Sequence, residues 1–191
     1  TVSNPTLRVA DLEAARAAAR RTGARLAIDN TFTTPRGFAA FAFGADVVVH
    51  SVTKLLAGHS DATLGWAAAR DPEDRAKLLA AQASFGATAS PFDCWLAERG
   101  LATFALRHDA AEANAAALAE LLAGLPGVAQ VIHPGRADHP DHARARALLG
   151  NRRGTMVAFR LEGGRGAVQR FLDAAPELAF GPSLGDVQTL I

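Results

Sequence analysis

The stretch DVVVHSVTK, residues 46–54, joins an apolar run to a polar turn that carries one of only two lysines in the chain. Consecutive valines without polar alternation predict a strand that is buried on both faces of a parallel sheet. Similar apolar runs stand at LAIDN, residues 26–30, and at residues 64–69. Because helical patterns alternate with these runs, the sequence predicts an α/β fold with its functional residues at the carboxyl ends of the strands.

Ala-rich segments bounded by Gly or Pro predict the helices. The expected helices cover residues 9–21, 71–83, 90–100, 101–123, 141–149 and 166–174, and two further strands cover residues 128–133 and 155–161. Polar linkers separate the elements of the second half, which is typical of a smaller α/β domain joined by a long helix. We therefore expect a larger domain over residues 1–105 and a smaller, incomplete one over residues 106–191.

The composition, 49% hydrophobic and 20% charged over 191 residues, excludes a disordered chain. A formal net charge of +1 offers no field that would attract nucleic acid or an anionic membrane. One cysteine cannot form an internal disulfide, and no apolar run approaches the roughly 18 residues of a membrane span, so we expect a cytoplasmic setting. Because the chain begins at Thr1 and stops at Ile191 in a loop-to-strand passage, we expect it to be part of a longer protein.

Lys54 is the first candidate for chemistry, because Arg supplies eighteen of the twenty basic residues and only Lys77 is a further lysine. An amine can form a Schiff base with an aldehyde and later move a proton, which a guanidinium cannot do. The hydroxyls of Ser51 and Thr53 can point at one anion, such as a phosphate. A surface lysine in a polar turn is the alternative interpretation.

Asp29 ends an apolar strand, where a buried acid needs a hydrogen bond or a cation partner. A pyridinium nitrogen is one such partner, and a carboxylate beside it keeps the ring protonated. Alternatively, Asp29 caps the turn at Asn30 and Thr31. The two roles are compatible with each other.

Six motifs together resemble the cysteine and methionine metabolism family of pyridoxal-phosphate enzymes, which includes cystathionine γ-synthase, cystathionine γ-lyase and methionine γ-lyase. They are SNPT at 3–6, AIDNTF at 27–32, VVVHSVTKLLAGHSD at 47–61, SPFDCWLAERGL at 90–101, VIHPG at 131–135 and SLGDVQTLI at 183–191. The resemblance covers essentially the whole chain. It implies the aspartate-aminotransferase-type fold (PLP fold type I), with a mostly parallel sheet in the large domain.

The resemblance also implies roles for residues that match the family motifs. Lys54 would form the Schiff base with pyridoxal 5′-phosphate, and Asp29 would pair with the pyridine nitrogen. Ser51 and Thr53 would hold the phosphate, and Asn4 would hydrogen-bond the 3′ oxygen of the cofactor. No metal is expected.

For the substrate, the resemblance implies that Ser183 helps to receive the α-carboxylate of an amino acid. The implied activity makes or breaks a C–S bond at the γ-carbon of a cystathionine- or homoserine-type amino acid, as a cystathionine γ-lyase or γ-synthase does. SPFDCWLAERGL favours those enzymes, whereas Asp186 favours the alternative of a methionine γ-lyase or an O-acylhomoserine sulfhydrylase. The family's tyrosine that stacks on the cofactor is missing, since the chain has no Tyr. The resemblance also implies a homo-oligomer, because family sites are completed across a subunit interface. The alternative from another class is a non-catalytic truncated fragment.

Other residues have structural interpretations. His59 and Asp61 are expected to order the turn after Lys54. Residues 138–142 hold two histidines and two aspartates that could bind a divalent metal, although a solvated loop before a helix is the preferred interpretation. Cys94 is expected to be a buried packing residue, and the glycines at 163–166 to form a tight turn.

Overall fold

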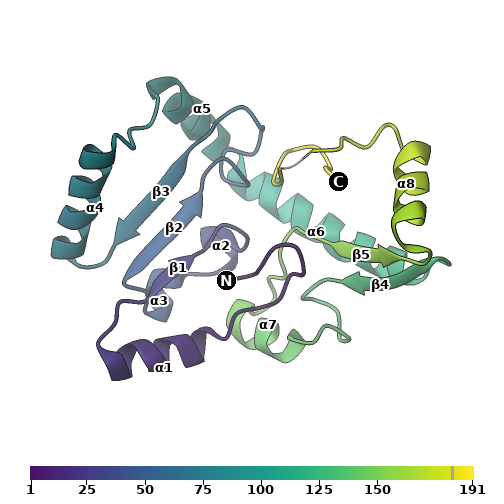
Figure 1. Ribbon diagram of the computed structural model, residues 1–191, viewed down its shortest axis with the longest axis horizontal. Coiled ribbons are helices and arrows are strands. Elements are labelled where there is room, and N and C mark those ends of the chain that lie inside the picture. The colour runs from purple at the N-terminus through teal and green to yellow at the C-terminus, as the bar shows by residue number, and fades with distance from the viewer. Residues whose placement is uncertain (182) are drawn as a thin grey trace.

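The computed structural model describes residues 1–181 and 183–191, and its strands form two separate sheets (Figure 1). The first sheet has the strand order β1-β2-β3, and the second pairs β4 with β5. The strands are β1 (Ala27–Asp29), β2 (Val47–Ser51), β3 (Gly65–Ala69), β4 (Val128–Ile132) and β5 (Ala158–Leu161). The long helix α6 (Phe104–Ala123) runs from the side of the first sheet to the second sheet, where it contacts β4 (Figure 1).

The first sheet is only partly parallel. β1 and β2 pair in parallel, with Asp29 opposite Val49, so their carboxyl ends lie at the same edge, as the sequence predicts. β3 is antiparallel to β2, with Ser51 opposite Gly65, which departs from the expected mostly parallel arrangement. The cause is the connection: residues 52–64 turn back without a helix, and a parallel crossover usually needs one.

The helices agree with the sequence prediction except for two short ones. The expected helices are α1 (Leu12–Thr22), α4 (Pro72–Phe85), α5 (Pro91–Leu101), α6, α7 (His142–Leu149) and α8 (Gly164–Ala174). Asp11 and Ser90 cap α1 and α5 through side-chain oxygens, and Gly23 ends α1 with a φ of 67°. The helices α2 (Thr34–Gly37) and α3 (Ala40–Phe43) were not expected, because four residues are too few to show a periodic pattern.

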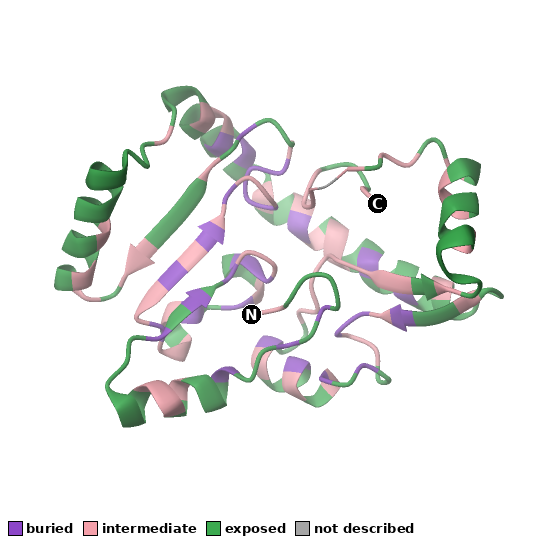
Figure 2. Cartoon of the chain, in the orientation of Figure 1, coloured by how far each residue is buried: buried purple, intermediate pink, exposed green. Residues whose placement is uncertain are grey.

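The main core lies on one face of the first sheet. Leu12, Leu26, Ile28, Val48 and Leu149 belong to one buried cluster, which joins α1, both parallel strands and α7. β1 alternates exposed, buried, exposed (Figure 2), so the prediction of a strand buried on both faces was wrong for the described chain. The outer side of β1, including Asp29, faces solvent.

Asp141 anchors the N-terminal segment to the start of α7. Its carboxylate, only 4% exposed, accepts hydrogen bonds from Arg8 Nε at 2.6 Å, Arg144 Nη1 at 2.8 Å and the Val9 backbone N–H at 3.0 Å. The Arg8 guanidinium is the main reason that the pKa of Asp141 falls to about 2. The expectation of a solvated loop at this position was therefore wrong, because buried ion pairs occupy the carboxylate.

Two further expectations concern surfaces. Cys94 is exposed on α5, so the prediction of a buried packing residue was wrong. Phe92 and Trp95, 65% and 56% exposed, stack on each other on the same helix. Within residues 1–181 and 183–191, no helix combines the length and apolar character needed to cross a membrane.

Candidate functional site

The carboxyl ends of β1 and β2 are joined through Thr31. The Asp29 carboxylate accepts the Thr31 backbone N–H at 2.9 Å, and the Thr31 hydroxyl accepts the Ser51 backbone N–H at 2.9 Å. Asp29 thus caps the turn as the alternative interpretation predicted. Because the side chain is exposed, it does not need the cation partner that burial would demand. The bond of the Thr31 hydroxyl to the Ser51 N–H was not expected from the sequence.

Lys54 follows β2 in the turn at residues 52–58, and its side chain is half-buried. Its Nζ donates to the hydroxyl of Ser183 at 2.9 Å, which joins two candidates that are 129 positions apart. Gly185, with a φ of +86°, lies against the same turn: a Cβ there would stand 2.5 Å from the Leu55 nitrogen and 2.8 Å from the Lys54 carbonyl carbon. The segment 183–188 is therefore packed directly on the backbone of the lysine turn.

Ser51 and Thr53 differ in their surroundings. The Thr53 hydroxyl accepts the Leu64 backbone N–H at 2.8 Å and lies 3.3 Å from the Leu64 carbonyl oxygen, so it bridges the two ends of the turn. The 3.3 Å contact is weak, which leaves the hydroxyl proton available to another acceptor. Ser51 ends β2 and is held through its backbone by Thr31.

Asn4 lies on an exposed turn beside the same sheet edge. The turn is closed by hydrogen bonds from Ser3 N to Arg8 O and from Leu7 N to Ser3 O, both 2.9 Å. The Thr33 hydroxyl donates to the Thr1 hydroxyl at 2.9 Å, which holds this segment near the turn after β1. The structure brings the segment of Asn4 close to the other candidates through Thr1, whose amino group also donates to the Asp29 carbonyl at 2.8 Å.

His50 is buried in β2 between the candidate residues. Burial lowers its pKa, against a smaller opposing effect of the Asp29 charge. Its ring packs on Trp66 of β3 with the centroids 5.5 Å apart. A neutral imidazole at this position follows from the removal of water around it.

The turn after Lys54 and the segment after Ser183 also meet through their polar residues. The ring of His59 contacts the Ala57 carbonyl at 2.7 Å, which confirms its predicted role in ordering the turn. Burial would raise the pKa of Asp186, but hydrogen bonds from the Ser60 hydroxyl and the Gln188 backbone hold it below its ordinary value. Asp61 is exposed.

Arg107 on α6 is a residue that sequence reasoning missed. Its guanidinium donates to the carbonyl oxygens of Leu55 at 2.9 Å, Leu56 at 3.0 Å and Gly100 at 2.8 Å. Nothing in its local sequence separates it from the other seventeen arginines. Only the fold shows that it reaches the turn of Lys54.

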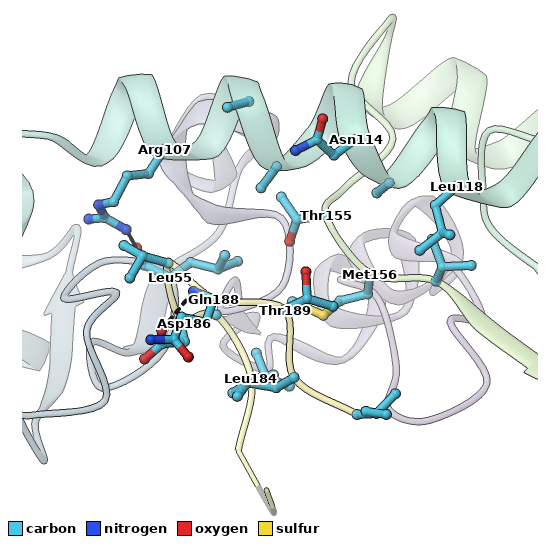
Figure 3. Close-up of a pocket in the computed structure, with 18 of the residues that line it drawn as sticks. Leu55, Arg107, Asn114, Leu118, Thr155, Met156, Leu184, Asp186, Gln188 and Thr189 are labelled. Atoms are coloured by element: carbon cyan, nitrogen blue, oxygen red, sulfur yellow. Dashed lines mark hydrogen bonds between the residues drawn. The ribbon is translucent and has the colours of Figure 1, made fainter. Parts of the chain in front are cut away.

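A cavity of about 580 Å³ separates α6 from the C-terminal segment (Figure 3). Arg107, Leu55 and Asp186 form one end of it, with Thr155 and Met156 farther along. Ser183 lines the cavity, whereas Lys54 and Asp29 are outside its lining. The cavity therefore adjoins the lysine turn from the side of α6 and does not mark the solvent-exposed edge of the sheet.

Among the described residues, one group has metal-ligand types in reach of one another: His108, Asp109 and Glu112, with their ligand atoms within 4.8 Å. Arginines already occupy its acids, since Arg36 pairs with Asp109 and Arg152 bridges Asp109 and Glu112 at 2.6 and 2.9 Å. The two arginines hold the pKa of Asp109 far below its usual range. The group is a network of ion pairs that ties α6 to α2 and to the segment after α7.

The donor set at the sheet edge fits a phosphorylated pyridine aldehyde. Lys54 supplies an amine, Ser51 and Thr53 supply hydroxyls within three residues, and Asp29 supplies an exposed carboxylate on the adjacent strand. An amine reacts with an aldehyde, hydroxyls bind phosphate, and a carboxylate binds a ring N–H. Each group that the cofactor presents thus has a partner of the required chemistry at this edge.

Comparison with known proteins extends over the entire chain. The model of the family described as "Cys/Met metabolism PLP-dependent enzyme" matches residues 1–191. Cystathionine gamma-lyase of Dictyostelium discoideum is 41% identical over 191 residues, which is 100% of this chain and 49% of that protein. L-methionine gamma-lyase of Pseudomonas putida is 40% identical over 98% of this chain and 47% of that protein. The chain thus spans about half the length of these curated relatives.

Solved structures give the same result. Cystathionine gamma synthase from Xanthomonas oryzae pv. oryzae, in complex with aminoacrylate and cysteine, is 44% identical with a TM-score of 0.92, over 97% of this chain and 48% of that one. CalE6, a methionine gamma lyase from Micromonospora echinospora, is 38% identical with a TM-score of 0.90, over 97% of this chain and 50% of that one. Together they confirm the fold class that the sequence motifs implied.

Proposed function

The chain belongs to the Cys/Met metabolism PLP-dependent enzymes, and from this premise we propose that the protein uses pyridoxal 5′-phosphate to make or break a C–S bond at the γ-carbon of a cystathionine- or homoserine-type amino acid. The observation that carries the proposal is the meeting of Lys54 Nζ and Ser183 Oγ at 2.9 Å, at the carboxyl end of β2. The cofactor, when bound, supplies an electron sink for the charge left by removal of the substrate's α-proton.

Lys54 is the group that holds and moves protons in this proposal. Its Nζ would hold the cofactor through the aldehyde group. As an amine, Lys54 would serve as the general base that takes the α-proton of the substrate. Such steps contribute typically about 10²- to 10⁴-fold to the rate.

The other candidates bind and orient. Asp29 would accept a hydrogen bond from the protonated pyridine nitrogen, and its carboxylate is already oriented by the Thr31 N–H. Ser51 and Thr53 donate to the phosphate, and Asn4 donates to the 3′ oxygen. Ser183 gives up its contact with Lys54 when it receives the substrate α-carboxylate. This exchange would link substrate binding to release of the amine.

Relatives with different reaction types have similar sequence identity to this chain. Cystathionine γ-lyase and γ-synthase are our first candidates, and methionine γ-lyase or O-acylhomoserine sulfhydrylase is the alternative that Asp186 favours. Proteins named cystathionine gamma-lyase and cystathionine gamma-synthase are 41% and 38% identical to this chain, so identity does not separate the activities. The products separate them: γ-elimination of cystathionine, with water, releases cysteine, ammonia and a four-carbon 2-oxo acid, whereas γ-replacement releases no 2-oxo acid.

We further propose a homo-oligomer that completes the site with a residue from a neighbouring subunit. Phe85, Phe92 and Trp95 are 86%, 65% and 56% exposed, which supports an apolar contact surface on α4 and α5. The exposed thiol of Cys94 supports a reducing, cytoplasmic location. The domain boundary near residue 106 is also proposed, and the division of the strands into one sheet before α6 in the chain and another after it supports the proposal.

Borohydride trapping tests the cofactor assignment. The protein is mixed with pyridoxal phosphate, its visible absorbance is recorded, and the adduct is reduced and mapped by peptide mass. We expect the adduct at Lys54, and its loss in Lys54→Ala but not in the matched variant Lys77→Ala.

The same test separates the enzyme from the non-catalytic alternative. An adduct only at Lys77, in this chain and in a longer form of the protein, would overturn the proposal and favour a fragment without a competent site. Where Lys54 is labelled, unreduced protein is assayed: 2-oxo acid release from cystathionine or methionine assigns an elimination, and formation of a thioether or thiol product from O-acylhomoserine and an added thiol or sulfide, without 2-oxo acid, assigns a replacement.

A further inference from the structure

The turn that carries Lys54 presents two carbonyl oxygens to a single side chain. Leu55 O accepts Arg107 Nη1 at 2.9 Å, and Leu56 O accepts Arg107 Nη2 at 3.0 Å. These are the two carbonyls that directly follow Lys54 in the chain. A planar guanidinium that bonds adjacent carbonyls fixes their orientation as well as their distance.

The same guanidinium is tied to the helices behind the turn. Arg107 Nη2 also donates to Gly100 O at 2.8 Å, and Arg107 Nε donates to the Thr103 hydroxyl at 3.1 Å. Gly100 belongs to the end of α5, and Thr103 directly precedes α6. Arg107 therefore connects the lysine turn to a rigid junction between two helices.

Two glycines leave the space for this connection. A Cβ at Gly58, whose φ is +74°, would stand 1.9 Å from Arg107 Nη1. A Cβ at Gly100 would stand 2.2 Å from the Ala57 carbonyl oxygen. The turn, α5 and the guanidinium are thus packed so closely that no side chain fits between them.

The segment of Ser183 closes on the turn from another direction. Gly185 lies against the Lys54–Leu55 peptide, and Asp186 lies near Arg107 at the end of the cavity (Figure 3). Burial lowers the pKa of Arg107, and the charge of Asp186 opposes that effect. Arg107 remains charged, so it can hold the turn and attract the segment at the same time.

We propose that Arg107 is the positioning residue of Lys54: its guanidinium fixes the turn at Leu55 and Leu56 so that the amine stays at Ser183. The inference rests on the proposed function, because it assumes that Lys54 binds the cofactor. Arg107 touches neither cofactor nor substrate in this proposal. It acts through the backbone that carries the amine.

The two lysines allow a test with an internal reference. The protein is treated briefly with pyridoxal phosphate and borohydride, and the ratio of adduct at Lys54 to adduct at Lys77 is measured by peptide mass. Lys77 is 66% exposed on α4, so its labelling does not depend on Arg107. The variant Arg107→Gln is chosen because a lysine at 107 would itself react, and Arg75→Gln, at an exposed position of α4, is the matched control.

We expect Arg107→Gln to lower the Lys54:Lys77 ratio at least tenfold, at a temperature where circular dichroism shows the wild-type fold, while Arg75→Gln leaves the ratio unchanged. A purely structural role would lower the melting temperature without changing the ratio in the folded protein. An unchanged ratio in folded Arg107→Gln would overturn the inference.

A milder variant covers the case in which Arg107→Gln does not fold. Thr103→Val removes the contact at Arg107 Nε and a long hydrogen bond, 3.3 Å, from the Thr103 hydroxyl to the Gly100 carbonyl, and we expect a smaller reduction of the ratio, about threefold. An unchanged ratio in this variant, with Arg107→Gln unfolded, also overturns the inference. If the wild-type protein shows no adduct at Lys54, the proposed function fails, and the inference fails with it. If the wild type is labelled at Lys54 and the variants are labelled equally, only the inference fails.

Discussion

Asp141 shows how one buried carboxylate can hold two distant segments together. It accepts hydrogen bonds from Arg8 and Arg144, and from the Val9 N–H. Replacing it by Asn removes the charge that faces two arginines. Because these arginines are 57% and 40% exposed and stay hydrated, the loss is that of charge-assisted hydrogen bonds, about 1 to 3 kcal/mol. We expect Asp141→Asn to lower the free energy of unfolding by this amount in urea titrations.

Asp138 is the matched control, because it also pairs with an arginine but is 61% exposed. Solvent screens such a pair, so Asp138→Asn should change the free energy of unfolding by less than about 1 kcal/mol. Equal effects of the two variants would contradict the role of burial.

The same carboxylate predicts a dependence on pH. The pKa of Asp141 is lowered to about 2 in the folded chain. Its stabilising contribution is therefore fully present above the unfolded-state pKa of about 3.9 and is lost as the pH falls toward the folded-state value. The difference in unfolding free energy between wild type and Asp141→Asn should shrink between pH 4 and pH 2, and a constant difference would speak against the ion pair.

At the scale of elements, Gly100 decides how closely α5 approaches the lysine turn. Alanine normally stabilises a helix by about 1 kcal/mol relative to glycine. At Gly100, however, the added Cβ would stand 2.2 Å from the Ala57 carbonyl oxygen. We expect Gly100→Ala to destabilise the protein by about 1 to 3 kcal/mol, because helix and turn must separate.

Gly166 in α8 is the control position, where alanine should have its ordinary stabilising effect on a helix. A Cβ at Gly166 would meet only Arg170 Nη1, at 3.6 Å, which is an ordinary contact. Gly166→Ala should raise the melting temperature, whereas Gly100→Ala should lower it. A stabilising Gly100→Ala would show that the approach of α5 is not constrained.

The long helices and the strands could be predicted from sequence because each has its own period, cap or terminating glycine. The direction of β3 could not be predicted, because the sequence of residues 52–64 does not show whether the chain crosses over to a parallel strand or turns back to an antiparallel one. Exposure of Asp29 and Cys94 was also beyond the sequence, because it depends on which elements cover a face. Lys54 and Ser183 were named from the motifs, but their contact was not predicted, and Thr31 and Arg107 act through bonds to residues 20 and about 50 positions away.

At the scale of the whole molecule, four buried histidines set the response to mild acid. Burial lowers the pKa values of His50, His108, His133 and His139. A lowered histidine pKa stabilises the fold above the unfolded-state value of about 6.5, and this contribution is lost as the pH falls below it. We expect the urea midpoint to decrease from pH 7.5 to pH 5.5.

The contribution of His108 to this pH dependence can be measured separately. Both of its ring nitrogens are buried without a hydrogen-bond partner among the described residues. His108→Leu should therefore keep the midpoint at pH 7.5 and reduce its decrease toward pH 5.5. A steeper decrease in this variant would contradict a neutral, buried imidazole.

The bond between Arg8 and Asp141 has a consequence for the order of events during synthesis. The two residues are 133 positions apart, and at about 5 to 20 residues per second a ribosome needs about 7 to 27 s to pass from one to the other. The interval between synthesis of Lys54 and of Ser183 is almost as long, because the two residues are 129 positions apart. The segment of Asn4 and the amine of Lys54 therefore stay without these partners while most of the chain is still being made, so a nascent chain that stops before residue 141 has neither attachment.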